Sequence, residues 1–253
     1  MMMYRPSFAS CPARELARVA FFVAVSAALG GCIPRAKPGS SPGAADSPEG
    51  KACPPDAVID DGEDTNNQLI VQKGRNGYFY TFADKTGATS VTPTAGDLGG
   101  TFTMAAGGAS ASAYAAHMTG KIGTGTVVFA GMGLNFTDPK GAYDASAYKA
   151  ITFWAKKGEG TGKVRLKVPS PDTDPDGKVC TECFNDFGAD LELSPEWAKY
   201  VVPFSSMKQL PGWGSPHPPA IVPSKLYGVQ FQVNTPGASF DVWIDDLQFT
   251  GCP

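Results

Sequence analysis

The sequence predicts an all-β protein whose folded part is a two-sheet antiparallel β-sandwich. The 253 residues include 30 Gly and 22 Pro, a composition typical of turn-rich β structure. Apolar and polar residues alternate with period two in several short segments, and no segment is convincing as a helix. Turn residues separate nearly all of these segments at fairly regular spacing, as expected for a sandwich or a barrel.

The first segment, residues 1–31, has the pattern of an export signal. Arginines precede an apolar run from Val19 to Gly31 that is too short to span a bilayer. The run ends in LGGC, which resembles the lipobox of bacterial lipoproteins, so we expect Cys32 to be acylated and to become the mature N-terminus. The alternative is an ordinary signal peptide with an accidental cysteine. Ile33 rather than Asp follows the cysteine, and the resemblance to lipoproteins sorted by the enterobacterial rule then implies anchoring in the outer membrane.

Residues 32–52 are expected to form a flexible tether. They are rich in Pro, Gly, Ser and Ala and contain almost no large apolar side chains, so they cannot bury enough surface to fold. About twenty residues of flexible chain reach roughly 25 Å on average. The folded domain is therefore expected to comprise residues 53–253.

The alternation within the strands assigns their faces. In AITFWAK, Ile151, Phe153 and Ala155 share one face and Trp154 lies on the other. The same pattern places in the core Val164, Leu166, Val168, Val229, Phe231 and Val233, and on an open polar face Arg165, Lys167, Gln230 and Gln232. Further strands are expected within residues 77–83, 114–122, 126–136, 199–205 and 239–250.

The last predicted strand, residues 239–250, changes phase in its middle. The apolar residues are in phase up to Ile244, but Leu247 and those after it are one position out. A β-bulge at Asp245 or Asp246 would restore the phase, and bulges tend to direct side chains towards sites.

Four cysteines remain in the expected domain, and in an exported protein an even number predicts disulfides. Four thiols permit three pairings, of which we favour Cys53–Cys252 and Cys180–Cys183. The first closes nearly the whole domain, which in the chain-entropy model contributes on the order of 5 kcal/mol, and it requires the two ends of the domain to be neighbours. The second closes a tiny ring, worth roughly 2 kcal/mol in that model, and is expected to fix the shape of a loop.

Other interpretations of the cysteine-containing loop are weaker. A redox pair would follow a strand leading into a helix, whereas CTECF follows an Asp/Pro-rich turn. A structural zinc site lacks enough nitrogen and sulfur ligands. Asp172, Asp174 and Asp176 have EF-hand spacing, but Cys183 stands where that loop needs its bidentate Glu, so a turn is favoured.

Charge and motifs exclude several function classes. The net charge is -3 and the basic residues are scattered, which argues against nucleic acid as a partner. The chain has no H-E-x-x-H motif, no G-x-S-x-G motif and no Gly-rich phosphate loop between a strand and a helix. We therefore expect no enzymatic activity, although the spacing of a carboxylate pair for glycoside hydrolysis cannot be judged from sequence.

The order of several segments resembles a known family. IDDGED, then YDASAYKAITFWAKKGEG with KVRLKVP, then SPEWAKYVVPFSSMKQ, and finally LYGVQFQV with FDVWIDDLQFTG resemble the galactose-binding-like jelly rolls. These include family 11 carbohydrate-binding modules and the complex I intermediate-associated-protein-like domains. The resemblance covers about residues 58–251 and is strongest over 144–251. CTECF, FGAD and DPDG also resemble domains of secreted or lipid-anchored proteins from myxobacteria-like organisms.

This resemblance implies a jelly roll whose ends meet around a structural calcium ion and whose concave sheet binds sugar chains. The positions that match the metal ligands are Asp61, Glu63, and Asp245 or Asp246. The alternative is that these acids are solvated residues that protect an edge strand from aggregation.

The open face is expected to recognise a polysaccharide, because aromatic rings stack on pyranose faces while amides and cations bond hydroxyls. The candidate ligand-binding residues are Trp154, Arg165, Lys167, Gln230 and Gln232, together with Tyr78, Tyr80 and His117. The alternative for each is an ordinary solvated or packing role. The sequence thus predicts a lipid-anchored, non-catalytic carbohydrate-binding module, and the alternative function is a structural or adhesive envelope protein that binds other proteins.

Overall fold

The computed structural model describes residues 53–96 and 100–252. The predictions made for residues 1–52, which are the export signal, the acylated Cys32 and the tether, lie outside the described residues. None of the helices in the described part of the chain is long and apolar enough to cross a membrane.

The described residues form strands joined by turns and short 3-10 helices. The strands are β1 (Val58–Asp60), β2 (Phe79–Ala83), β3 (Ser90–Thr92), β4 (Ala105–Ala106), β5 (Tyr114–Lys121), β6 (Ala130–Asn135), β7 (Ala150–Lys157), β8 (Lys163–Val168), β9 (Phe187–Glu192), β10 (Ala198–Pro203), β11 (Gly228–Val233) and β12 (Ser239–Thr250). The 3-10 helices are η1 (Pro55–Ala57), η3 (Pro175–Gly177), η4 (Phe204–Ser206) and η5 (Pro223–Lys225).

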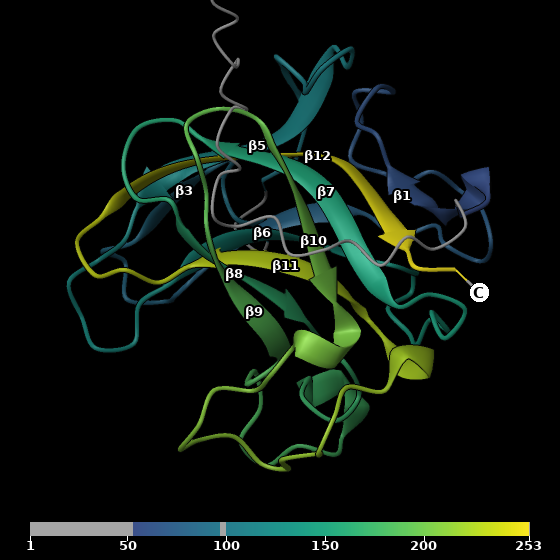
Figure 1. The fold of residues 1–253 in the computed structure, drawn as a ribbon. Coiled ribbons are helices and arrows are strands. Elements are labelled where there is room, and N and C mark those ends of the chain that lie inside the picture. Colours follow the sequence, from purple (N-terminus) through teal and green to yellow (C-terminus); the bar gives the residue numbers. More distant parts are fainter. Residues whose placement is uncertain (1–52, 97–99, 253) are drawn as a thin grey trace, which may run out of the picture. The chain divides into compact units, whose positions relative to one another are not determined.

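These strands pair into two antiparallel sheets that pack face to face (Figure 1). The seven-stranded sheet has the order β10-β7-β12-β5-β3, with β1 beside β12 and β4 beside β5. The five-stranded sheet has the order β2-β6-β11-β8-β9. Strands far apart in sequence are neighbours in both sheets, so the fold is the β-sandwich that the sequence predicts.

The core between the sheets is built from the residues that the alternation assigns to it. Phe153 of β7 and Phe231 of β11 are fully buried and meet edge to face, with ring centroids 5.0 Å apart. Such aromatic pairs contribute about 0.5–1.5 kcal/mol beyond the burial of their area. The predicted inward residues of β8 and β11 are all buried as well.

The two ends of the described chain are held together, as the sequence predicts. Cys53 and Cys252 form a disulfide, and β1 pairs antiparallel with β12. Arg75, which is fully buried, donates to the carbonyl oxygens of Asp56 and Val58 at 2.8 and 2.6 Å. The disulfide and the strand pairing hold the first segment of the domain against its last strand, and Arg75 ties it to the segment before β2.

Every strand expected from the alternation is present. The register of β12 against β7 shifts between Asp245 and Gln248, and Asp246 has a positive φ of 47°, which confirms the predicted bulge. The alternation did not identify β1, β3, β4 or β9, and β1 has three residues. Strands β3 and β4 have three and two residues, and the small residues of β9 (FGADLE) give no clear alternation.

Candidate functional site

The five-stranded sheet carries a groove on the face turned away from the core. Its floor begins at β2 and β6, where Tyr80 pairs with Gly133 and Phe82 pairs with Gly131. A Cβ added to Gly131 would lie 2.4 Å from Cζ of Phe82, and one added to Gly133 would lie 3.2 Å from Cζ of Tyr80. The two aromatic rings therefore lean across β6 and cover positions that have no side chain.

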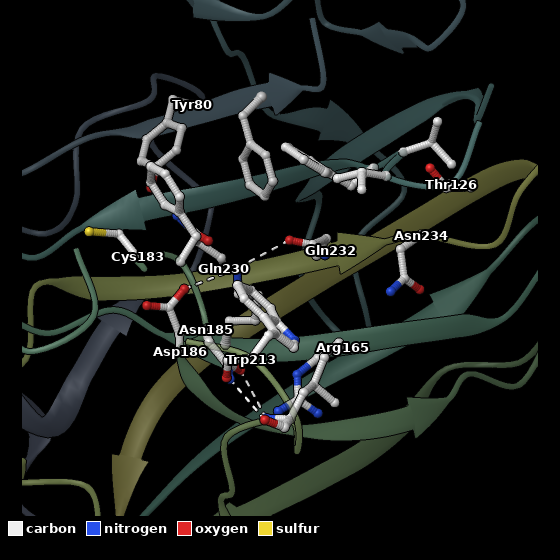
Figure 2. Close-up of a pocket in the computed structure, with 17 residues that line it drawn as sticks. Tyr80, Thr126, Arg165, Cys183, Asn185, Asp186, Trp213, Gln230, Gln232 and Asn234 are labelled. Atoms are coloured by element: carbon white, nitrogen blue, oxygen red, sulfur yellow. Dashed lines mark hydrogen bonds and ion pairs between the residues drawn. The ribbon is translucent and has the colours of Figure 1, made fainter. Parts of the chain in front are cut away.

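The groove has a volume of about 530 Å³. Its lining comes from β2, β8 and β11, from residues 126–129 before β6, and from two loops around residues 183–186 and 210–213. In Figure 2, the amides of Gln230 and Gln232 lie between Tyr80 on one side and Trp213 and Arg165 on the other. The lining thus combines aromatic rings with a central row of polar groups.

Hydrogen bonds fix the orientation of the two central amides. Nε2 of Gln230 donates to Oη of Tyr80 at 3.0 Å, and Nζ of Lys167 donates to Oε1 of Gln232 at 3.2 Å. These bonds leave Oε1 of Gln230 to accept from a ligand, and Nε2 of Gln232 to donate to one. Burial raises the pKa of Tyr80 to about 12, so its hydroxyl stays protonated.

The two cationic side chains of the floor form ion pairs with aspartates of the same domain. Arg165 and Lys167 are only 8% and 7% exposed. Lys167 forms an ion pair with Asp186 at 3.0 Å, and Arg165 pairs with Asp190 at 2.9 Å. Both cations lie on the outer face of the sheet, as the alternation predicts, but this part of the face is not open to solvent, because loops after β8 and β10 cover them.

The structure brings together five of the eight predicted ligand-binding residues, namely Tyr80, Arg165, Lys167, Gln230 and Gln232. It does not bring Trp154 or His117 to the groove, because β7 and β5 belong to the seven-stranded sheet. Tyr78 precedes β2 outside the groove lining, and its hydroxyl accepts a hydrogen bond from Gln68. Period-two alternation identifies the two faces of a strand but not the sheet to which the strand belongs.

His117 instead belongs to a cluster on the outer face of the seven-stranded sheet. Its ring stacks on Trp243 with centroids 3.7 Å apart, and its Nε2 lies 2.9 Å from Oδ1 of Asp241. Nζ of Lys156 lies 4.9 Å from the centroid of the Trp243 ring and 4.8 Å from the centroid of the Trp197 ring. The polar and charged groups of this cluster thus contact one another on the outer face of that sheet.

The sequence reading missed the exposed aromatic residues of the groove. Phe184 and Trp213 are 59% and 42% exposed and line it from the two loops. Both lie outside the strands, so no alternation marks them. Only their neighbours in the sequence could have marked them as loop residues of a site: Phe184 follows the disulfide of CTECF, and glycines flank Trp213.

Acidic residues of the first and last strands meet at a second, small pocket. Asp60, Asp245 and Asp246 line it. Asp60, which the sequence reading missed, is buried, and its Oδ2 has no hydrogen-bond partner in the described residues. Burial raises the pKa of Asp60 to about 7 and that of Asp245 to about 6.

The four predicted calcium ligands lie around this junction. Burial is the main cause that raises the pKa of Asp246, and the negative charges of Asp61 and Glu63 raise it further. These carboxylates are therefore close enough to Asp246 to act on it. Each of the other three also accepts backbone N–H groups: Asp61 from Glu63, Glu63 from residues 113 and 114, and Asp245 from residues 109 and 246. Within residues 53–96 and 100–252, no three His, Cys, Asp or Glu side chains form a group that could hold a metal ion by themselves. A cation here would also need backbone carbonyls or water.

The Asp-rich turn with EF-hand spacing forms ion pairs with a lysine side chain from another segment of the chain. Nζ of Lys140 lies 3.0 Å from Oδ1 of Asp174 and 2.5 Å from Oδ2 of Asp176. Residues 175–177 form the 3-10 helix η3. The preference for a turn over a calcium loop agrees with this geometry. The Cys180–Cys183 disulfide beside it is also present.

Comparison with solved structures identifies proteins of similar fold. The domain is similar to the family 11 carbohydrate-binding module of the cellulosomal cellulase Lic26A-Cel5E of Clostridium thermocellum, with a TM-score of 0.52 and 13% identity over 77% of this chain and 94% of that one. It is similar to a solution structure described as CtCBM11, with a TM-score of 0.51 and 13% identity over 78% and 95% of the two chains. A third structure is the Clostridium thermocellum family 11 module in complex with a β-1,3-1,4-mixed-linked tetrasaccharide, with a TM-score of 0.49 and 13% identity over 69% and 89%. The first two show that the domain has the fold that the sequence resemblance implies.

No protein-family model and no curated protein matches the sequence.

From the raised pKa values of the two buried acids we predict that the stability of the protein falls as the pH rises towards neutrality. The ordinary pKa of Asp60 is 3.8, and it is about 7 in the folded protein, so the folded state binds the extra proton between these values. This contribution to stability is complete below pH 4 and is lost as the pH rises through 7, and Asp245 acts in the same direction through pH 6. In EDTA, the free energy of unfolding should fall by about 3 kcal/mol between pH 5 and pH 8 on account of Asp60.

Urea denaturation at both pH values measures this change. Asp60→Asn keeps an oxygen that can accept from Gly62, and it should remove most of the slope. A stability that rises over this range, or an unchanged slope in Asp60→Asn, would contradict the assignment.

Proposed function

We propose that this domain is a non-catalytic carbohydrate-binding module that holds a polysaccharide in the groove of the five-stranded sheet. The observation that carries the proposal is the floor of this groove, where Tyr80 and Phe82 lie over the glycines of β6 beside two oriented amides. The C–H faces of pyranose rings pack on aromatic rings, and their hydroxyls both donate and accept hydrogen bonds. The floor offers partners for both.

The charges of the groove favour an uncharged polysaccharide. Arg165 and Lys167 are each paired with an aspartate, so neither cation is free to attract an acidic sugar. The Lys167–Asp186 pair is buried, and removing either of its partners leaves an uncompensated charge, which is strongly unfavourable. A uronic acid would gain little here and would compete with Asp186 and Asp190.

The same pairing supports binding rather than hydrolysis. Among the described residues that line the groove, Asp186 is the sole acid, and it is tied to Lys167 and to the hydroxyl of Thr173. Glycoside hydrolysis ordinarily needs two carboxyl groups facing the scissile bond. The groove lining offers no such pair.

Polysaccharide binding can be tested with variants on the two sheets. Affinity electrophoresis would use mixed-linkage β-1,3-1,4-glucan, xylan, mannan and polygalacturonate. We expect retardation by one or more of the neutral polymers, and a loss of about 10-fold or more in affinity in Tyr80→Ala and Phe82→Ala. Trp154→Ala on the opposite sheet is the matched control and should bind as the wild type does.

Two results would contradict this function. One is retardation by no polysaccharide combined with capture of a protein from envelope extracts, which would favour the structural or adhesive alternative. The other is release of reducing sugar from any of the polymers, which would indicate an enzyme.

We further propose that a structural calcium ion joins the first and last strands at the acidic pocket. The support is the unpartnered, buried Oδ2 of Asp60 next to Asp245 and Asp246, because carboxylate oxygens are the ligands that calcium prefers. Glu63 and Asp61 lie at the same junction and add negative charge.

Calcium should therefore raise the melting temperature of the protein after EDTA treatment. At 100 times its dissociation constant the ion would add about 2.7 kcal/mol, or roughly 5–10 °C for a domain of this size. Differential scanning fluorimetry with CaCl₂ or MgCl₂ measures this rise, which should be absent in Asp245→Asn. The control is Asp176→Asn in the turn occupied by Lys140, which should respond as the wild type does. Equal melting temperatures with and without calcium in the wild type would refute the site.

We also propose that the protein is exported and held at the cell envelope, in the outer membrane, by a lipid on Cys32. The support is the LGGC motif after the apolar run, followed by the low-complexity segment 33–52. Cells of a bacterial host grown with labelled palmitate should incorporate the label into the wild-type protein and not into Cys32→Ser. Label in Cys32→Ser, or none in the wild type, would contradict the anchor.

A further inference from the structure

One wall of the groove is made from two loops that are far apart in sequence, residues 180–186 and 209–216. Asn185, which is buried, connects them through both ends of its amide. Its Nδ2 donates to the carbonyl oxygens of Leu210 at 2.8 Å and Trp213 at 2.5 Å, and its Oδ1 accepts from the N–H of Leu210 at 2.9 Å. The position of the Trp213 loop therefore depends on the loop that contains Asn185.

A short ladder adds a second connection between the loops. Thr181 N–H donates to the carbonyl oxygen of Ser215 at 2.9 Å, and Ser215 N–H donates to that of Glu182 at 3.0 Å. The N–H of Gly214 donates to Oε2 of Glu182 at 3.0 Å. Gly214 has a φ of 90°, and a Cβ there would lie 2.6 Å from Cβ of Asn185, so this close approach requires glycine.

The Cys180–Cys183 disulfide closes the first loop next to this ladder. Cys183 lines the groove, and Phe184 follows it with a φ of 75°. A bulky residue seldom adopts a positive φ unless its surroundings impose it. Here the N–H of Phe184 donates to the carbonyl oxygen of Thr173 at 2.6 Å, between the disulfide on one side and the buried Asn185 on the other.

This arrangement holds two exposed aromatic side chains on the groove. Phe184 and Trp213 both line it, and in Figure 2 the Trp213 ring lies across the row of amides from Tyr80. A rigid wall that keeps apolar rings exposed gains free energy when a ligand covers them, because the apolar area is then removed from water.

We infer that Phe184 and Trp213 are further binding residues, which contact the polysaccharide from the wall. We also infer that the Cys180–Cys183 disulfide is a positioning element that acts mainly through Phe184 and, to a smaller extent, through the loop of Trp213. The inference rests on the proposed function. The floor supplies the flat aromatic surface and the hydrogen bonds, and the wall supplies a second apolar surface against the same chain. Without the disulfide, Phe184 must be ordered when the ligand binds, and this ordering lowers the affinity.

The test measures the affinity for mixed-linkage β-1,3-1,4-glucan, or for the neutral polymer of the panel that retards the wild type most. Phe184→Gly and Trp213→Ala should each weaken binding about 10-fold. Phe184→Gly should leave the melting temperature unchanged or higher, because glycine adopts the positive φ freely. The control is Val179→Ala, an exposed residue of the adjoining segment that does not line the groove, and it should bind as the wild type does.

A double-mutant cycle tests the role of the disulfide. Replacing both cysteines, Cys180→Ser with Cys183→Ser, should weaken binding about 5-fold in the wild-type background and by a clearly smaller factor in Phe184→Gly, where only the position of the Trp213 loop is left to lose. An equal loss in both backgrounds would overturn the positioning role. Unchanged binding in Phe184→Gly and in Trp213→Ala would overturn the wall as a binding surface.

Hydrogen exchange separates this inference from the proposed function. Without any ligand, the double cysteine variant should exchange faster at the amides of Leu210, Gly214 and Ser215, which the first loop holds. Unchanged protection there would refute the disulfide as the element that fixes the wall. If the wild type binds no polysaccharide, the proposed function fails and the wall as a polysaccharide contact fails with it, while exchange still decides whether the disulfide ties the two loops.

Discussion

The groove depends on a constraint in β6, which carries hydrogen atoms in place of side chains on its outer face. A Cβ at Gly131 would collide with the ring of Phe82, and one at Gly133 would collide with Cγ of Gln230 and crowd the ring of Tyr80. Glycine in a strand costs stability, because it loses more backbone entropy than other residues and has no side chain to pack. Two aromatic rings lying over it recover part of this cost and form a flat floor.

The rest of the site is held in place from this floor and from the ends of the domain. The hydroxyl of Tyr80 orients Gln230, while the Lys167–Asp186 pair orients Gln232 and reaches the base of the aromatic wall. Polar networks of this kind favour one arrangement when their members are satisfied. On the other sheet, β12 pairs with β1, β5 and β7, and its bulge brings the buried acids of the first and last strands together.

Sequence patterns predicted the local features of this protein and missed those that depend on sheet order. The alternation identified the core faces of β7, β8 and β11, and the even number of cysteines in the expected domain predicted the disulfide between the ends. The alternation could not show that Trp154 lies on the sheet opposite to Arg165. It could not reveal Phe184 and Trp213 either, because loops and not strand phase bring them to the groove.

The central claim is that a neutral polysaccharide lies on the glycine and aromatic floor of the five-stranded sheet. The most direct test is a titration of the ¹⁵N-labelled protein with an oligosaccharide of mixed-linkage β-1,3-1,4-glucan, followed by amide chemical shifts. The account predicts that the largest changes fall on Gly131, Gly133 and Gln232. Changes concentrated at Lys156 and Trp243 on the seven-stranded sheet, with the groove unaffected, would contradict it.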